Sequence, residues 1–237
     1  MARDLRIGLV CLTYLYNEER VAWARRSFES LLRTETPGYQ PVMLMVIRLG
    51  FAGLRGVLPE GYFPQFRTLM NLQPPDAKDA CAAATWGFDC LFRNHEEVTH
   101  GFFLADDFIY HPKWMIELEG VINRHPQAKS WSVYRSGNTR WHRTLDVQGD
   151  DHLVSSISGP GAFSRSEWEE WGVDYHSFPW QGGWTLDVLH PELRPGERWV
   201  TGRSYIQQIG VRGMHNRAGE CDESLDFVGE ATEVMQP

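Results

Sequence analysis

The chain has 237 residues, of which 42% are hydrophobic and 13% aromatic, enough for the core of one large α/β domain or two small ones. Its formal net charge of −8 argues against a protein that binds phosphate backbones in general, without ruling out a locally basic groove. Cys11, Cys81, Cys90 and Cys221 form no C-x-x-C pair, which indicates neither a zinc site nor a disulfide scaffold. No cleavage site follows the apolar run that ends before Asn17, and no stretch is long enough to span a membrane. We therefore expect a cytoplasmic protein without a membrane segment.

The first half alternates between strand and helix patterns. Residues 5–12 form an almost continuous apolar run, which is typical of a strand buried on both faces. A helical apolar stripe follows over 18–32, and a second apolar strand over 42–47 completes a βαβ unit of a parallel sheet. After an irregular segment over 48–75, the expected elements are a helix over 78–92, a strand over 101–105, a helix over 112–124 and a strand over 130–134.

The second half loses this regular alternation. In chain order we expect a polar loop or ribbon over 136–151, a strand over 153–157, a glycine-rich turn over 158–161, a short helix over 164–172, a loop of glycines and aromatics over 178–183 and strand character over 199–210. The acidic tail over 219–237 is expected to be loosely held. The whole chain, 1–237, is expected to form a single domain.

Two adjacent acids follow the buried strand at 101–105. Asp106 and Asp107 stand at the carboxyl end of that strand, and Pro112 opens the next helical pattern. In open α/β sheets ligands bind at this edge, and a pair of carboxylates there suits a hard cation such as Mg²⁺ or Mn²⁺ together with a phosphate. The alternative is that both acids only cap the turn and the helix.

Several motifs of the chain, taken together, point to a known family. They are an apolar strand that runs into Thr13, Tyr14 and Asn17; the run 102–107 followed by Pro112 and Trp114; the glycine-rich segment 158–165 that ends in Arg165; the acid Asp187 after Trp184; and the segment 205–210 that leads to His215. This pattern resembles the nucleotide-sugar-dependent glycosyltransferases with the GT-A fold, most closely the large inverting family 2 group.

The resemblance implies a fold and a division of the chain. The fold is an α/β, Rossmann-like GT-A fold, with a mostly parallel central sheet flanked by helices and an irregular acceptor-side half at the C-terminal end. Residues 1–129 would bind the nucleotide-sugar donor and residues 130–218 the acceptor, with 219–237 as the acidic tail.

The resemblance also implies roles for particular residues. Donor contacts fall on Thr13, Tyr14, Asn17 and Asp106. Asp107 and His215 would hold Mn²⁺ or Mg²⁺, and Asp187 would be the base that accepts the proton of the acceptor hydroxyl. Arg165 ends the acceptor-side segment. Beside the resemblance, Arg48 and Lys78 are candidates for contact with the diphosphate or base because they are cations, and Trp180 and Trp184, which flank two glycines, are candidates to stack on the acceptor sugar. Each role has a plainer alternative: a packed histidine, a turn acid with Asp174, Glu169 and Glu170 as rival bases, or tryptophans that only fasten a loop to the core.

The chain departs from the family pattern at two positions. Ala105 stands where the first acid of the usual Asp-x-Asp motif is expected, which leaves Asp106 to reach the ribose or sugar and Asp107 to hold the metal. Arg48 follows the second strand where an Asp usually reads the base, so uridine specificity stays open. A UDP-sugar is the donor we expect first.

Four functions are therefore weighed. The first is a metal-dependent, inverting glycosyltransferase that moves a sugar from a nucleotide-diphosphate-sugar to a saccharide or other hydroxyl acceptor. A second is a DNA glycosyltransferase acting on a hydroxymethylated base, suggested by a basic and aromatic cluster of Trp131, Arg135, Arg140, Trp141, His142 and Arg143. A third is a nucleotidyltransferase, disfavoured because no glycine-rich phosphate loop with a lysine follows the first strand. The fourth is a non-catalytic module that binds nucleotide or carbohydrate.

Overall fold

The computed structural model describes residues 4–48, 57–58, 63–72, 80–137, 143–157, 160–171, 196–210, 224 and 226–229. The strands are β1 (Ile7–Tyr14), β2 (Val42–Arg48), β3 (Arg67–Leu72), β4 (His100–Ala105), β5 (Phe108–Tyr110), β6 (Ser130–Ser132), β7 (Thr144–Gln148), β8 (Asp151–Val154), β9 (Ala162–Ser164), β10 (Arg198–Thr201) and β11 (Ile206–Gln208). The helices are α1 (Glu18–Leu31), α2 (Ala80–Asn94), α3 (Trp114–Arg124) and α4 (Arg165–Trp171).

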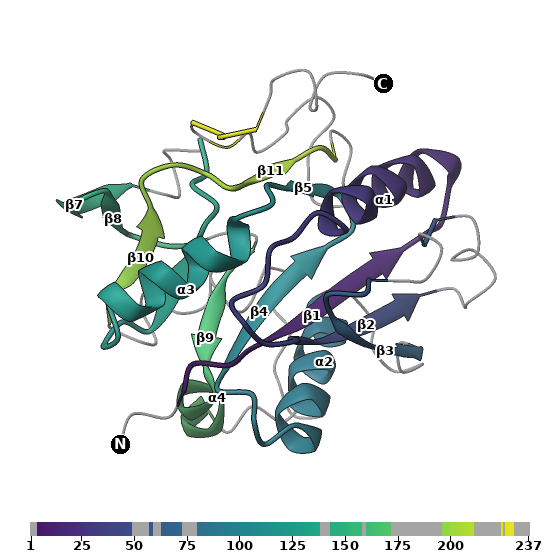
Figure 1. Ribbon diagram of the computed structural model, residues 1–237, viewed down its shortest axis with the longest axis horizontal. Coiled ribbons are helices and arrows are strands. Elements are labelled where there is room, and N and C mark those ends of the chain that lie inside the picture. The colour runs from purple at the N-terminus through teal and green to yellow at the C-terminus, as the bar shows by residue number, and fades with distance from the viewer. Residues whose placement is uncertain are drawn as a thin grey trace.

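A nine-stranded sheet in the order β3-β2-β1-β4-β9-β6-β10-β8-β7 forms the centre of the molecule (Figure 1). Strands β3, β2, β1 and β4 are paired in parallel, and β10 is parallel to β6. β9 runs antiparallel to both of its neighbours, as does β8. All other strands of this sheet therefore point the same way, and the mostly parallel sheet expected from the sequence is confirmed.

Helices cover the sheet on both faces. On one face the indole N–H of Trp114 in α3 donates to the hydroxyl of Thr34, just beyond α1, at 2.9 Å, and the Trp114 ring packs on Phe102 of β4. On the other face Phe88 of α2 meets Trp168 of α4 with ring centroids 5.7 Å apart. Because side chains alternate along a strand, Phe102 faces α3 while its neighbour Gly101 faces α2.

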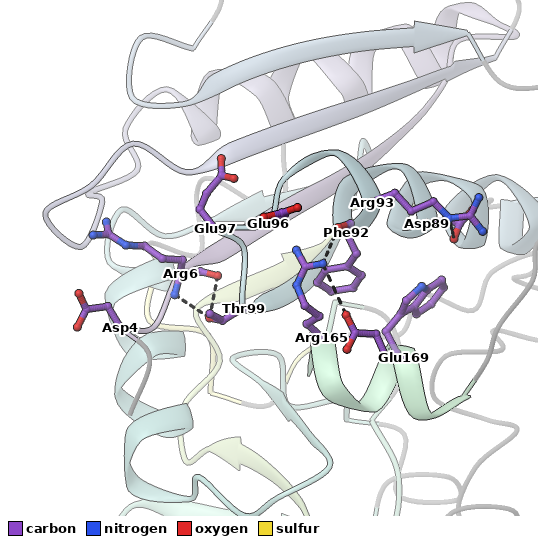
Figure 2. A pocket seen from close by; sticks show the side chains of 11 residues that line it. Asp4, Arg6, Asp89, Phe92, Arg93, Glu96, Glu97, Thr99, Arg165 and Glu169 are labelled. Atoms are coloured by element: carbon purple, nitrogen blue, oxygen red, sulfur yellow. Dashed lines mark hydrogen bonds and ion pairs between the residues drawn. The ribbon is translucent and has the colours of Figure 1, made fainter. Parts of the chain in front are cut away.

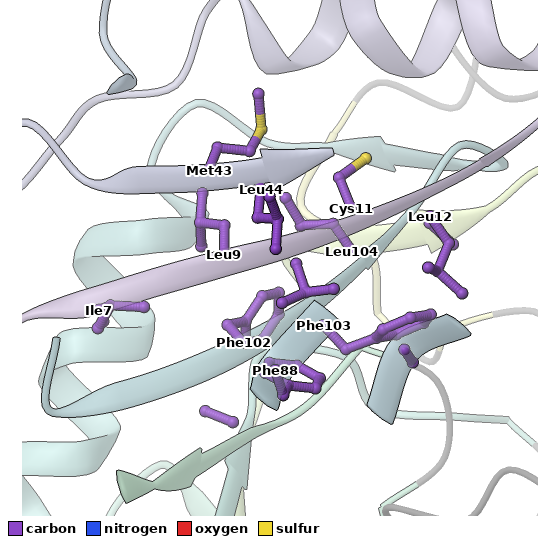
Figure 3. Close-up of a cluster of buried hydrophobic side chains, with 14 of the residues drawn as sticks. Ile7, Leu9, Cys11, Leu12, Met43, Leu44, Phe88, Phe102, Phe103 and Leu104 are labelled. Atoms are coloured by element: carbon purple, nitrogen blue, oxygen red, sulfur yellow. The ribbon is translucent and has the colours of Figure 1, made fainter. Parts of the chain in front are cut away.

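The core explains why these runs form strands. Every residue of β1 is buried, and side chains of β1, β2, β4 and α2 gather in one cluster (Figure 3). A strand that is buried on both faces must be apolar throughout, which is the pattern that the sequence shows over these segments. No helix within the described ranges is both long enough and apolar enough to cross a bilayer.

Four short strands were not expected from the sequence. β3 falls within the segment expected to be irregular and β7 within the expected polar ribbon. β5 and β9 lie between expected elements, β5 after the strand at 101–105 and β9 directly after the glycine-rich turn. β7 escaped the prediction because all of its residues are exposed, including Leu145 and Val147. Such a strand carries no alternation between a buried and a solvated face.

Of the expected tail, the structure describes Ser224 and residues 226–229, and these are held against the body. Ser224 forms a β-bridge with Ser136, and Phe227 forms one with Ser204. Phe227 also packs on a small apolar cluster that contains Trp23 of α1. These residues lie beside β11, which pairs antiparallel with β5 in a separate two-stranded sheet.

Candidate functional site

The candidate site lies at the carboxyl edge of the parallel strands. β1 ends opposite β2 with Tyr14 paired to Arg48, and Leu12 of β1 is paired to Ala105, the last residue of β4. The turn Asp106–Asp107 follows Ala105 directly, so the ends of three strands reach this edge. Ligands of open α/β sheets bind at such an edge, as the sequence led us to expect.

Arg20, in the first turn of α1, contacts both acids. Its Nη2 donates to Oδ1 of Asp106, and its Nη1 donates to Oδ2 of Asp107 at 3.0 Å. Its Nε donates to the carbonyl oxygen of Tyr14 at 3.3 Å, and the backbone N–H of Tyr14 donates to Oδ2 of Asp106 at 2.7 Å. The guanidinium group therefore joins the end of β1 to the turn after β4.

These groups are withdrawn from solvent. The exposed fractions are 1% for Asp106, 8% for Asp107 and 7% for Arg20. Burial raises the pKa of Asp106, the nearby charge of Asp107 raises it further, and Arg20 together with the Tyr14 N–H acts in the opposite direction. A buried carboxylate pair that shares one arginine carries an excess negative charge, which favours a further cation nearby.

The other donor residues expected from the first strand sit at the same edge. Asn17 is the N-cap of α1, and its Oδ1 accepts from the backbone N–H of Arg20 at 2.8 Å. Arg48 lies over the ring of Tyr14 at 5.2 Å from its centroid, while Thr13 is fully buried. The structure thus places Thr13, Tyr14, Asn17 and Arg48 at the edge where the acidic pair lies, with Tyr14 bonded to Asp106, and their contact with a donor stays a prediction.

The segment after β11 also reaches this edge. The backbone N–H of Ile209 donates to the carbonyl oxygen of Asp107 at 2.8 Å. Gly210 lies so close that a Cβ built on it would be 2.6 Å from Oδ2 of Asp107. His215, five residues further along the chain, lies outside the described residues.

Arg165 is placed elsewhere. It begins α4, and its backbone N–H donates to the carbonyl oxygen of Thr99, at the amino end of β4. Its guanidinium group donates to the carbonyl oxygens of Phe92 and Val98 at 2.5 and 2.8 Å, and to that of His95 at the end of α2. Arg165 therefore fastens α4 to α2 at the edge of the sheet opposite the acidic pair.

The remaining predicted site residues lie outside the described residues. They are Lys78, Trp180, Trp184 and Asp187, together with His215.

Two members of the basic and aromatic cluster weighed for a DNA acceptor are engaged within the protein, whereas Arg143 is exposed and Arg140, Trp141 and His142 lie outside the described residues. Trp131 is 1% exposed, and its indole N–H donates to the carbonyl oxygen of His125 at 2.9 Å. Arg135 donates to the carbonyl oxygen of Gly202 at 3.1 Å and lies 3.7 Å from a carboxylate oxygen of Asp226. Trp131 belongs to the core because its strand, β6, lies between β9 and β10 inside the sheet. The spacing of apolar residues along the sequence does not reveal that position.

A separate hollow of about 790 Å³ lies at the opposite edge of the sheet (Figure 2). Its lining mixes cations with acids, among them Arg6, Arg93, Glu97 and Glu169. Arg165 lines it too, but with its nitrogens bonded to main-chain carbonyls. Because its charges are of both signs, and because the carboxyl ends of the parallel strands face away from it, we do not take this hollow as the active site.

The acidic pair has the chemistry for a divalent cation but does not complete a site among the described residues. Oxygen ligands suit Mg²⁺ and Mn²⁺, and within the described part of the chain nothing bonds to Oδ1 of Asp107. No group of three or more His, Cys, Asp or Glu side chains that could hold a metal occurs among those residues. Among the described residues, Asp107 can supply one ligand to such a cation.

Two residues of this site were missed at the level of sequence. Gly210 carries no local signal, because its importance comes from a close approach to Asp107 in space. Arg20 does carry one: a cation in the first turn of a helix is opposed by the helix dipole, and the preceding residues Glu18 and Glu19 are the favoured kind. A basic residue in that position, on the inner face, indicates an acidic partner.

Comparison with known proteins places the fold. No family model and no curated protein matches the chain. The crystal structure of S. aureus TarS 1-349 matches with a TM-score of 0.60 at 11% identity, over 85% of this chain and 60% of that one. The crystal structure of mannose-1-phosphate geranyltransferase from Thermus thermophilus matches with a TM-score of 0.57 at 13% identity, over 87% of this chain and 77% of that one.

These likenesses confirm the predicted GT-A-like fold, with a large sheet of parallel strands between helices. The chain spans about 60% of the length of the TarS fragment that it matches. At these identities the likeness concerns the fold, and the activity has to be argued from the site.

Proposed function

We propose that the protein is a metal-dependent glycosyltransferase that moves a sugar from a nucleotide-diphosphate-sugar, with a UDP-sugar as the first expected donor, to a hydroxyl acceptor. The observation that carries the proposal is the position of Asp106 and Asp107. They form a buried acidic pair at the edge where β1, β2 and β4 end, in a fold shared with nucleotide-sugar transferases.

Each residue of the edge has a role in this proposal. Asp106, held by the Tyr14 N–H, would accept from a hydroxyl of the donor's ribose or sugar. Arg48, half-buried over Tyr14, would contact the base or the diphosphate. Asp107 with His215 would hold Mn²⁺ or Mg²⁺, which when bound neutralises the charge of the leaving diphosphate.

Transfer also requires a base, because an acceptor hydroxyl is too weakly acidic to attack unaided. We propose Asp187 for this role in an inverting reaction, with Trp180 and Trp184 as acceptor contacts. A saccharide is the acceptor class that we favour over DNA, because Trp131 and Arg135 are engaged within the protein.

Donor binding tests the proposal directly. Thermal unfolding is followed with UDP, GDP, CDP and dTDP, each with Mn²⁺ and each with EDTA, because a ligand that binds only the folded state raises its melting temperature. We expect one diphosphate to raise it with Mn²⁺ and not with EDTA. Saturation at about 100 times Kd would stabilise by about 2.7 kcal/mol.

A matched pair of variants places the effect at the site. Asp107→Ala should abolish the Mn²⁺-dependent shift and donor hydrolysis, whereas Asp146→Ala, on the exposed strand β7, should keep both. A full shift in Asp107→Ala would show that the metal binds elsewhere. Binding of a diphosphate without any transfer or hydrolysis would favour the non-catalytic module.

A further inference from the structure

We propose that Arg20 is a positioning residue that acts as the internal counter-ion of Asp106 and Asp107 and weakens their binding of a free divalent cation until a diphosphate is present. This inference rests on the proposed function, because it concerns the cation and the diphosphate of the same site. It adds a residue that lies outside the motifs of the family resemblance.

The geometry singles out Arg20. One nitrogen of its guanidinium group donates to each carboxylate, and a third donates to the Tyr14 carbonyl, so the group bridges both acids and the end of β1. A planar fork with several donors can hold two carboxylates at a fixed separation, which a point charge such as lysine cannot do. Arg20 therefore sets where the oxygens of the acidic pair point.

Arg20 is also fixed in place. Its backbone N–H is bonded to the N-cap Asn17, and its guanidinium carbon lies 5.5 Å from the ring centroid of Trp23, one turn along α1. Trp23 in turn belongs to the apolar cluster on which Phe227 packs. A side chain that is 9% exposed and held from three sides stays beside the acids when a ligand arrives.

The balance of charge gives the consequence. The two carboxylates would attract a divalent cation strongly, but Arg20 already offsets part of their charge and repels a second cation at close range. Repulsion between charges is strong in a buried setting, where water screens little. A diphosphate brings further negative charge and oxygen ligands, so the cation binds well only together with it.

If Arg20 only formed a structural ion pair, its replacement would act differently. The replacement would lower the stability of the fold, and the protein that remained folded would bind Mn²⁺ with the affinity of the wild type. The decisive readout is therefore the affinity for Mn²⁺ alone, measured on protein that is shown to be folded.

The experiment titrates the full chain with Mn²⁺ and follows free Mn²⁺ by electron paramagnetic resonance, with and without the diphosphate that stabilises the wild type. Arg20→Gln keeps polarity and removes the charge. Arg124→Gln is the matched control, because Arg124 also donates from two nitrogens to a buried carboxylate, that of Asp151, at 2.6 and 2.9 Å.

We expect Arg20→Gln to bind Mn²⁺ alone at least about tenfold more tightly than the wild type and to gain less when the diphosphate is added. Arg124→Gln should bind as the wild type does. Folded Arg20→Gln with unchanged or weaker affinity for Mn²⁺ alone would overturn the role of Arg20. A wild type that binds no Mn²⁺ with any diphosphate would instead overturn the proposed function, and this inference with it.

Arg20→Lys covers the case in which Arg20→Gln does not fold, as judged by circular dichroism and thermal unfolding. An ammonium group keeps the charge but cannot bridge both acids and the Tyr14 carbonyl as the guanidinium does. Because the charge is kept, we expect Arg20→Lys to bind Mn²⁺ alone within about twofold of the wild type. Folded Arg20→Lys that bound Mn²⁺ alone about tenfold more tightly than the wild type would overturn the role of the charge.

Discussion

Gly210→Ala tests the approach of the chain after β11 to the acidic pair. A Cβ at this position would be 2.6 Å from Oδ2 of Asp107 and 3.0 Å from its Cβ, both shorter than an ordinary contact. The carboxylate must move by about 0.8 Å to reach a normal separation, which breaks the 3.0 Å hydrogen bond from Arg20. Overpacking of this kind costs about 1–3 kcal/mol.

For a chain of this length, a loss of about 2 kcal/mol lowers the melting temperature by roughly 4–8 °C. The assay is thermal unfolding with and without Mn²⁺ and the stabilising diphosphate, and we expect the ligand-induced shift to fall as well. Gly120→Ala is the control, because its Cβ would meet only the end of Arg124, and alanine is the better helix former. If Gly210→Ala melted and bound ligand as the wild type does, the contact between Gly210 and Asp107 would not exist in solution.

Two further predictions concern the amino end of β4. Burial lowers the pKa of His100 to about 4, so its contribution to stability is present above the unfolded value of about 6.5 and is lost as the pH falls toward 4. At pH 5 the loss in the free energy of unfolding is about 2 kcal/mol. Urea unfolding at pH 7 and pH 5 should show this loss in the wild type and not in His100→Gln. Equal pH dependence of stability in the two proteins would contradict the prediction. Gly101→Ala would place a Cβ 2.8 Å from Phe88 and 2.9 Å from Phe92. We expect the free energy of unfolding, measured with urea, to fall by about 1–3 kcal/mol. A variant as stable as the wild type would show that α2 can shift without cost.

The parallel core and the position of the acidic pair could be predicted from sequence because both are local signals. The run 7–14 is buried along its whole length, and a strand of that kind reads as an almost continuous apolar run, here broken by Thr13. Asp106 and Asp107 follow such a run directly, and the edge to which they belong is then fixed by the direction of the chain.

What the sequence did not predict depends on contacts between distant segments. Arg20 meets Asp106 across 86 residues of chain, and a charged residue on a helix is by default expected in solvent. The fully exposed β7 and the three-residue β9 are strands only through their pairing with neighbours, β8 in the first case and β4 and β6 in the second. Arg165 matched a motif, but main-chain carbonyls of α2 and the loop after it engage its guanidinium group.

The order of the strands has a consequence for synthesis on the ribosome. β4 completes the parallel group, yet its second partner β9 is made only after α3, β6 and the β7–β8 hairpin have left the exit tunnel. Until then the nascent chain presents one unpaired edge of β4, rich in phenylalanine and leucine, which is a template for association with other chains. The interval between synthesis of β4 and synthesis of β9 is thus the stage at which this edge is most open to such association.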